Sequence, residues 1–312
     1  MSPILPGFFE HPQDVLSQVN SWQATGQRCV LVVLVETIGG SVRAPGAMMA
    51  VAADGRHVGY LSGGCIDADV VLQAQGALVQ NRPRLVRYGQ GSPFVDLPLP
   101  CGGGLVLAMV PDPNPAQVKR CVDQLLGRQS VSFCLDQLGN GEVQPADLEV
   151  AQGRFDLTPK LRLRVAGKGT DALALAQLAL SSGYQVQLQT GDQALAAQAS
   201  NLGTVEVQEL AIPAHIPPAQ DDAWTAFVLL FHDLDWEVAL LKQALGGSAF
   251  FIGAVGSPNT HQRRVEALQA AGLNGGQIAR IHAPVGLVPS MRNASALAIS
   301  TLAQIIQEFH SG

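Results

Sequence analysis

Two of the five cysteines in this chain lie beside glycine runs, a combination that could hold an anionic ligand with an affinity for sulfur. Cys65 ends the sequence SGGC, and Cys101 begins the sequence CGGG. Thiolates bind soft metals, and the backbone N–H groups of glycine-rich loops bind anions. The candidate ligand contacts from these two loops are Gly63, Gly64, Cys65, Cys101, Gly102 and Gly103.

The remaining cysteines are Cys29, Cys121 and Cys134. We interpret them as small buried hydrophobic residues, because a lone cysteine is more often part of a core than reactive. Cys65 differs, because the helix predicted to start directly after it would lower the pKa of its thiol. An odd number of cysteines without disulfide-framework spacing predicts free thiols in a reducing compartment.

The two glycine-flanked cysteines must be positioned by an N-terminal set of strands and helices. Apolar runs predict strands at residues 29–36, 47–52, 58–61, 85–88 and 105–110, and helical spacing predicts helices at 12–25 and 66–79. The Asp-Gly pair between the second and third of these strands predicts a hairpin. Cys65 is therefore expected at a loop-to-helix junction, and Cys101 in a bend that leads into a strand.

The second half of the chain predicts a Rossmann-like, doubly wound parallel sheet. From residue 161 the pattern is strand, glycine turn, helix and strand, which is the βαβ unit of such sheets. The proline-rich sequence over 110–117 ends the first unit. The fold class is thus α/β, with a mixed-sheet N-terminal domain. The expected divisions are 1–117 for a cofactor-handling domain, 118–160 for a connecting segment and 161–312 for the Rossmann-like domain.

The first glycine turn of the second half resembles a dinucleotide fingerprint without matching it fully. Gly167 and Gly169 follow a predicted strand and open a predicted helix, as that fingerprint requires. However, the next strand ends at Thr190 and Gly191, where an acidic residue should hold a ribose hydroxyl. Asp171 also adds negative charge where a pyrophosphate would lie. An NAD(P) ligand is therefore disfavoured, and a Rossmann fold kept for architecture is favoured.

Two further turns of the second half contain candidate ligand residues. His232 and Asp233 follow a predicted strand, at the edge where open α/β sheets bind ligands, although Asp233 could simply cap the next helix. Gly256 and Ser257 form a turn that could hold an anion with Arg264 as a clamp, although helix arginines are usually solvated.

Composition excludes several classes of function. Only 14% of residues are charged, the net charge is −6 and Lys and Arg do not cluster, so no nucleic-acid partner is expected. The longest apolar runs are of strand length, so no membrane partner is expected. The first residues lack the pattern of a secretory signal, and a cytoplasmic location is expected. Serine-hydrolase and zinc signatures are absent from the sequence.

Several motifs in order resemble the XdhC/CoxI family, the accessory proteins of xanthine dehydrogenase and related molybdenum hydroxylases. The resemblance covers roughly residues 28–112 and 161–308. The motifs that carry it are VETIGGSVRAPGAMMAVAADGRHVGYLSGGCIDADV, LPCGGGL, FFIGAVGSPNTHQRRVEAL and ARIHAPVGL.

The resemblance implies a chaperone for molybdenum cofactor (molybdopterin) and not an enzyme. Such a protein binds the cofactor, protects it while a cysteine desulfurase exchanges an oxo ligand for sulfido, and inserts it into an apo molybdenum hydroxylase. Cys65 and Cys101 would contact the molybdenum, and Arg43 would meet the cofactor phosphate. Further candidate contacts in the second domain are Gly167, Gly169, His232, Asp233, Gly256 and Ser257. The family also implies a homodimer.

Some positions depart from the pattern of the family. Lys168 and Thr170 interrupt its Gly-Ala-Gly-His turn, Asp67 replaces its usual Glu, and Val288 replaces its usual Asp. These changes leave the first-domain site intact and put nucleotide use of the second domain in doubt. The partner expected from these changes is a molybdenum hydroxylase either of the xanthine dehydrogenase type or of the aldehyde oxidoreductase type. Two alternatives stay open: an NAD(P)-linked oxidoreductase, and an assembly factor without bound cofactor.

Overall fold

The computed structural model describes residues 9–89, 92, 102–139 and 153–311. The chain divides into two compact units, one formed by Phe8–Pro159 and the other mainly by Lys160–Gly312. Each unit has its own sheet and its own hydrophobic core. Cys101 lies outside the described residues.

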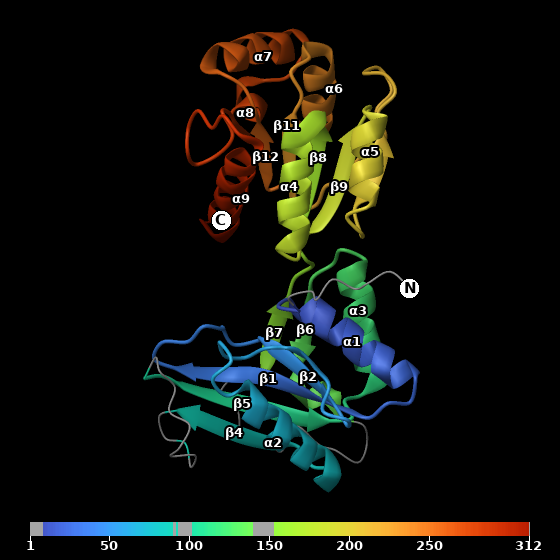
Figure 1. Ribbon diagram of the computed structural model, residues 1–312, viewed down its shortest axis with the longest axis vertical. Coiled ribbons are helices and arrows are strands. Elements are labelled where there is room, and N and C mark those ends of the chain that lie inside the picture. Colours follow the sequence, from blue (N-terminus) through green and yellow to red (C-terminus); the bar gives the residue numbers. More distant parts are fainter. Residues whose placement is uncertain (1–8, 90–91, 93–101, 140–152, 312) are drawn as a thin grey trace. The chain divides into compact units, whose positions relative to one another are not determined.

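The first unit is built on a five-stranded sheet (Figure 1). Its strands are β1 (Cys29–Ile38), β2 (Met48–Ala52), β3 (His57–Gly59), β4 (Arg84–Gly89) and β5 (Gly104–Pro111). The strand order is β3-β2-β1-β5-β4. Every described pairing in this sheet is antiparallel, which corrects the expectation of a mixed sheet. The α/β character of the unit is confirmed.

Helices cover both faces of this sheet. Helix α2 (Asp67–Gln80) packs on one face, against alternate β1 residues such as Val30 and Val32. Helices α1 (Pro12–Ala24) and α3 (Pro115–Leu126) pack on the other face, where β1 presents Leu31 and Val33. Figure 1 shows α2 on the side of the sheet opposite to α1 and α3. This double cover explains why β1 is apolar from Cys29 to Val35 instead of alternating with polar residues.

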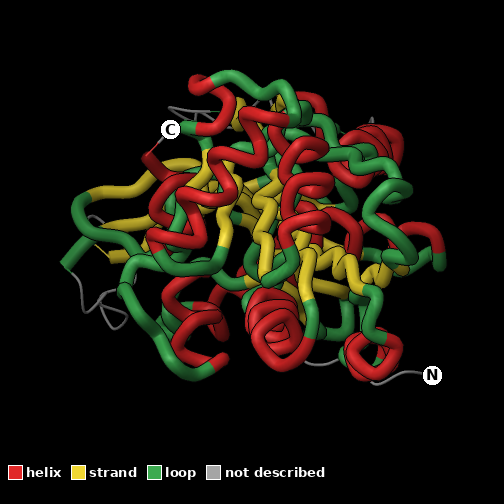
Figure 2. Tube along the Cα trace, turned by 90° about the horizontal axis from the view of Figure 1, so that it is seen from above, coloured by secondary structure: helices red, strands yellow, loops and turns green. Residues whose placement is uncertain are grey.

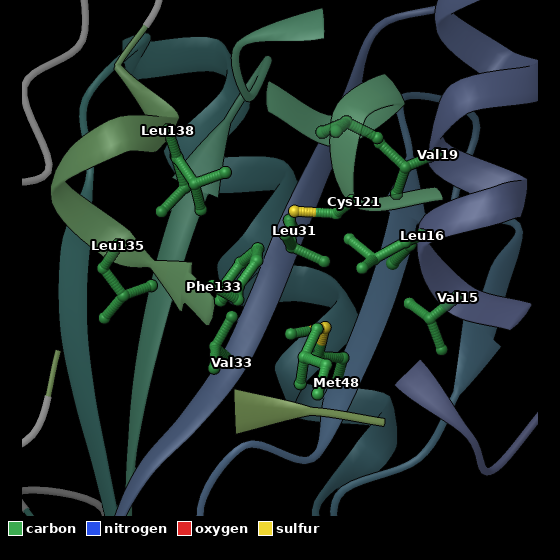
Figure 3. Packing of buried hydrophobic residues seen from close by; sticks show 14 of the residues in the cluster. Val15, Leu16, Val19, Leu31, Val33, Met48, Cys121, Phe133, Leu135 and Leu138 are labelled. Carbon is green, nitrogen blue, oxygen red and sulfur yellow. The ribbon is translucent and has the colours of Figure 1, made fainter. Parts of the chain in front are cut away.

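The expected connecting segment contributes to the core of the first unit. It contains α3, β6 (Val131–Cys134), a short 3-10 helix η1 (Leu135–Leu138) and β7 (Arg154–Leu157). Strands β6 and β7 form a two-stranded antiparallel sheet. Phe133, Leu135 and Leu138 pack with residues of α1, β1 and β2, as Figure 3 shows.

Strand β1 carries one extra residue relative to its neighbour β5. Leu34 pairs with Leu107, but Glu36 pairs with Val106, so Val35 forms a β-bulge between them. A bulge bends a strand and increases its twist, and it is often found near functional sites. Here it precedes the loop that continues β1 beyond Ile38.

The second unit is a six-stranded parallel sheet with the strand order of Rossmann domains, β10-β9-β8-β11-β12-β13. Its strands are β8 (Arg162–Gly167), β9 (Gln185–Thr190), β10 (Glu206–Glu209), β11 (Thr225–Leu230), β12 (Phe251–Ala254) and β13 (Ile281–His282). All the described pairings in this sheet are parallel. The predicted Rossmann-like sheet is therefore confirmed.

Helices flank the second sheet on both faces, and Figure 2 shows yellow strands between red helices. Helices α4 (Gly169–Ser181), α5 (Gln193–Ser200) and α9 (Ala294–Ser311) pack on one face. Helices α6 (Leu234–Leu245), α7 (Pro258–Ala270) and α8 (Gly275–Ile278) pack on the other. Among the described helices, none combines the length and apolar character that crossing a bilayer requires.

Candidate functional site

Cys65 is an exposed, free thiol in the turn between β3 and α2. The two glycines before it leave the turn open, because a side chain added at Gly63 or Gly64 would meet nothing within 4 Å. Gly64 has φ +96°, a backbone conformation that favours glycine. The predicted junction of loop and helix is confirmed, and the thiol stands in open space beside accessible backbone.

Asp67, the first residue of α2, organises the turn that carries Cys65. Its Oδ1 accepts hydrogen bonds from the backbone N–H groups of Leu61 (3.3 Å) and Ser62 (3.1 Å), and from Ser62 Oγ (3.1 Å). Ser62 Oγ accepts in turn from the N–H of Ile66 (3.2 Å). One carboxylate therefore ties both ends of the SGGC turn together. The sequence did not predict these contacts of Asp67.

The second glycine loop is packed against the loop that follows β1. A Cβ added at Gly103 would lie 2.3 Å from the backbone oxygen of Gly40 and 2.7 Å from that of Ile38. Gly102 has φ +68° and open space around it. Glycine is therefore required at the two positions for different reasons. Gly103 permits a close backbone contact, and Gly102 permits a left-handed turn.

Strand register places the two glycine loops at the same end of the first sheet. β1 and β4 both end beside the start of β5, because Ile38 and Gly89 each pair with Gly104. β3 ends at the same side, because its last residue, Gly59, pairs with Met49 near the start of β2. The loops that follow β1 and β3 and the loop that precedes β5 therefore leave the sheet at one end. This end is called the glycine-loop end below.

Helix α2 brings the Cys65 turn toward the start of β5. Tyr88 Oη, on β4, donates a hydrogen bond of 2.6 Å to Asp69 Oδ2 in the first turn of α2. Tyr88 pairs with Leu105, the second residue of β5. Burial and the Asp69 carboxylate both raise the pKa of Tyr88, which keeps the phenol a hydrogen-bond donor. The first turn of α2 thus lies over the strand that follows the CGGG loop.

Arg43 lies in the loop between β1 and β2, with its guanidinium already in contact with protein groups. Nη1 lies 2.6 Å from Glu10 Oε1, and Nη2 donates to the backbone oxygen of Glu10 at 2.6 Å. The guanidinium carbon lies 4.6 Å from the centre of the Tyr60 ring. The side chain is 9% exposed. The arginine predicted to contact a phosphate is therefore half-buried, and its guanidinium is paired with the Glu10 carboxylate.

The other described cysteines differ from Cys65 in exposure. Cys29 is fully buried in β1, and burial, with a smaller effect of Asp112, raises its pKa to about 12. Cys121 is 1% exposed in α3, and burial raises its pKa as well. The expectation of buried thiols is confirmed for these two. Cys134 is only half-buried, because it lies near the end of the short strand β6.

In the second unit, a cavity of about 420 Å³ lies where β8 and β11 end. It is lined by Lys168, Thr170, Asp171, Leu230, Phe231, His232 and Asp233. Gly167 stands where a Cβ would lie 2.9 Å from that of Leu230, so it serves close packing, while Gly169 adopts φ +67°. Asp233 caps α6, since its Oδ1 accepts from the N–H of Asp235 (3.1 Å). The capping interpretation of Asp233 is confirmed.

The position that should hold the ribose acid of a dinucleotide is closed to side chains. A Cβ at Gly191 would lie 2.7 Å from the backbone oxygen of Leu210. Thr190, the residue before it, is 1% exposed, and its Oγ1 accepts from the N–H of Asp192 (3.1 Å). No acidic side chain can therefore extend from residue 191 without a shift of the backbone.

The turn that contains Gly256 and Ser257 is held by protein groups. Ser257 Oγ accepts from the N–H of Thr260 (3.1 Å) and caps α7. Arg264 is fully buried, pairs with Glu237 at 2.8 Å and donates from Nη2 to the backbone oxygen of Val255 at 2.8 Å. The arginine considered as an anion clamp or a solvated helix residue instead joins α7 to α6 and to the turn. In the described part of the chain, no group of three or more His, Cys, Asp or Glu side chains is arranged to hold a metal ion.

Comparison with known proteins gives consistent matches along most of the chain. A family model described as "XdhC and CoxI family" matches residues 22–89, and one described as "XdhC Rossmann domain" matches residues 163–305. The molybdenum cofactor insertion chaperone PaoD of Escherichia coli is 34% identical over 286 residues, which cover 90% of this chain and 83% of that protein. This chain belongs to the XdhC and CoxI family.

Two other similar proteins span nearly the whole XdhC-type chain. A Bacillus subtilis protein described as a probable xanthine dehydrogenase subunit is 25% identical over 320 residues, covering 90% of this chain and 93% of that protein. A crystal structure described as a xanthine dehydrogenase from Bacillus halodurans superposes with a TM-score of 0.73 at 22% identity, covering 95% and 96% of the two chains. At that identity the likeness shows the fold alone.

Sequence reasoning missed two residues at the glycine-loop end of this XdhC-type protein. Glu10 precedes the first helix, and Tyr60 precedes the SGGC turn, and both contact Arg43. Tyr60 lies within the first motif of the family resemblance but no role was predicted for it, and Glu10 lies outside the motifs, 33 residues away from Arg43 in sequence. The arginine itself was the only indication of these contacts, because a guanidinium that is shielded from solvent requires a partner.

Proposed function

We propose that this protein is a chaperone that binds molybdenum cofactor and inserts it into a molybdenum hydroxylase. The observation that carries the proposal is the exposed Cys65 thiol in an open glycine turn, at the end of the sheet where the CGGG loop also lies. The similarity to a molybdenum cofactor insertion chaperone over 83% of its length supports the identity of the cargo.

The chemistry of the cargo fits the groups at the glycine-loop end. Molybdenum is thiophilic, so the Cys65 thiolate can serve as a ligand while the cofactor is carried. The accessible backbone at Gly63, Gly64 and Gly102 offers N–H donors to its anionic groups. Cys101 directly precedes Gly102, and in this proposal it supplies the second thiolate.

The exposed position of Cys65 suits transfer of the cargo in both directions. A bound cofactor would be open to a cysteine desulfurase that replaces an oxo ligand with sulfido, and then to an apo-hydroxylase of the xanthine dehydrogenase or aldehyde oxidoreductase type. We further propose that the chain works as a homodimer in the cytoplasm. Light scattering on a gel-filtration column would test the dimer, because a single-chain mass would contradict it.

Measurement of bound pterin tests the cysteine assignment. The protein, produced in cells that make molybdenum cofactor, is compared with the Cys65→Ala, Cys101→Ala and doubly substituted variants. Loss of a metal ligand should weaken binding by about tenfold or more, equivalent to about 1.4 kcal/mol. The matched control is Cys134→Ala, which removes a half-buried thiol from β6. Pterin content unchanged in the double variant would contradict the assignment, and co-purification of a hydroxylase without pterin would favour a cofactor-free assembly factor.

A further inference from the structure

The guanidinium of Arg43 is shielded on one side and pairs on the other with a carboxylate at the surface. Its side chain is 9% exposed, whereas that of its partner Glu10 is 60% exposed. The flat guanidinium lies against the ring of Tyr60 at 4.6 Å. Ser41 fixes the backbone beside it, because Ser41 Oγ accepts from the N–H of Arg43 (3.2 Å) and donates to its carbonyl oxygen (2.7 Å). The arginine is therefore held in place, and its anionic partner stands at the surface.

We propose that Arg43 is the binding site for a phosphate monoester, and that the Glu10 carboxylate occupies this site until the phosphate displaces it. The inference rests on the proposed function only for the identity of the molecule that carries the phosphate. What it adds is a competitor within the chain, because in the protein without ligand the Glu10 carboxylate occupies the site where the phosphate would bind.

The chemistry of the guanidinium supports this exchange. Arginine presents N–H donors in a rigid fork that matches a carboxylate and a phosphate in the same way. A phosphate dianion carries more charge and more acceptor oxygens than a carboxylate, so it gains more from the same guanidinium. Glu10 loses little on release, because its side chain is mostly solvated and surface ion pairs are weak.

The position of the pair connects it to the Cys65 turn. Tyr60 directly precedes Leu61 and Ser62, which the Asp67 carboxylate holds. Arg43 lies in the loop that follows β1, at the glycine-loop end of the sheet. A ligand bound through a thiolate at Cys65 and a phosphate at Arg43 would therefore be held at two points on one end of the first unit.

Displacement of Glu10 also has a consequence for the start of the chain. The ion pair and the bond to the Glu10 backbone oxygen attach the residues before α1 to the β1–β2 loop. Exchange of the carboxylate for phosphate breaks the first of these contacts. The amides around Glu10 should then lose protection from hydrogen exchange when phosphate binds.

A titration with phenyl phosphate, followed by ³¹P NMR, tests the proposal without any molybdenum cofactor. Glu10→Gln removes the competing charge and should strengthen binding by about two- to fivefold, the range expected from the loss of an exposed ion pair. Arg43→Gln should weaken binding by about tenfold or more, because charged hydrogen bonds to the phosphate are lost. The matched control is Glu36→Gln, which removes the same charge at the same end of the sheet from a residue that does not contact Arg43.

Two results would overturn the proposal. One is unchanged or weaker phosphate binding in Glu10→Gln, which would make the pair a structural link only. The other is an equal gain in Glu36→Gln, which would assign the effect to net charge. In the Arg43→Gln background, Glu10→Gln should have no effect, since the competition acts through that arginine. Phosphate binding by a protein that never carries pterin would sustain this inference and contradict the proposed function, so the two failures are distinguishable.

Discussion

Exposure separates Cys65 from the buried cysteines of the described chain, and chemical reactivity should follow the same division. Thiolates, and not thiols, are the reactive species, and buried thiols resist deprotonation. Cys29, with its pKa raised to about 12, stays protonated throughout the physiological range. Only an opening of the first unit would expose it.

Labelling with iodoacetamide should therefore modify Cys65 in the folded protein and leave Cys29 and Cys121 unmodified at pH 8. The rate at Cys29 should stay low as the pH rises to 9, and it should increase sharply in urea. Mass spectrometry of peptides measures each site separately. Comparable rates at Cys29 and Cys65 in the native protein would contradict the described burial.

Asp67 should determine the geometry of the Cys65 turn, because one carboxylate oxygen accepts three hydrogen bonds. Asp67→Ala leaves these donors without a partner and should lower the free energy of unfolding by about 1–3 kcal/mol. Asp67→Asn keeps one acceptor oxygen and should cost less. Urea unfolding measures both. Equal stability of Asp67→Ala and the unaltered protein would show that water replaces the carboxylate.

At this scale the sequence predicted types of residue better than their partners. Serine and glycine before Cys65 correctly predicted an exposed junction, because such residues make turns and leave space. The partner of Arg43 was not predictable, since contacts between distant residues depend on the fold. Arg264 was misjudged for the same reason: only the packing of α6 beside α7 shows that Glu237 neutralises it.

Elements with strong apolar patterns were predicted, and short polar elements were not. Strand β10 has the sequence EVQE, and β13 has only two residues, so neither shows a period. The hairpin of β2 and β3 was predicted, but the antiparallel direction of the other pairings in the first sheet was not. Its strands β1 and β5 are buried on both faces, a pattern that usually indicates parallel sheets.

The contact between the CGGG loop and the loop after β1 should be sensitive to a single methyl group. Gly103→Ala would place a Cβ 2.3 Å from the Gly40 backbone oxygen, and a backbone atom cannot turn aside as a side chain can. We expect destabilisation of about 2–4 kcal/mol. Gly63→Ala is the control, because a Cβ there meets nothing within 4 Å, and its effect should stay within about 0.5 kcal/mol. Urea midpoints compare the two, and similar losses would contradict the packing of the loops.

On the scale of the whole molecule, the chain holds two units with separate sheets and cores. Each sheet is complete within its unit, and no strand is shared between them among the described pairings. The expected boundary near residue 160 followed from the change in pattern at that point. The contribution of residues 118–159 to the first core could not be predicted from the sequence, because β6 and β7 are short and far apart in the chain.

Fragments 8–159 and 160–312 should therefore each fold alone and unfold cooperatively, and their circular dichroism spectra should sum to that of the intact protein. A fragment that ends at residue 117 should be the failing control. It lacks most of α3 and all of β6 and β7. Core residues that pack beside Phe133, such as Leu31 and Val33, would therefore be exposed. Cooperative folding of this shorter fragment would contradict the packing described for the first unit.

The bulge at Val35 places two successive side chains of β1 on the same face of the first sheet. Val35 faces α1 and α3, and so does Glu36, because its partner Val106 belongs to that core. Thr37 then returns to the side of α2, beside Leu105. Without Val35, Glu36 would follow Leu34 directly and could keep Val106 as its partner, so Thr37 and Ile38 would stay on their present faces. The register that brings the Gly40 loop beside Gly103 therefore does not depend on the bulge, and the extra residue contributes a bend in β1, added twist and one more buried valine.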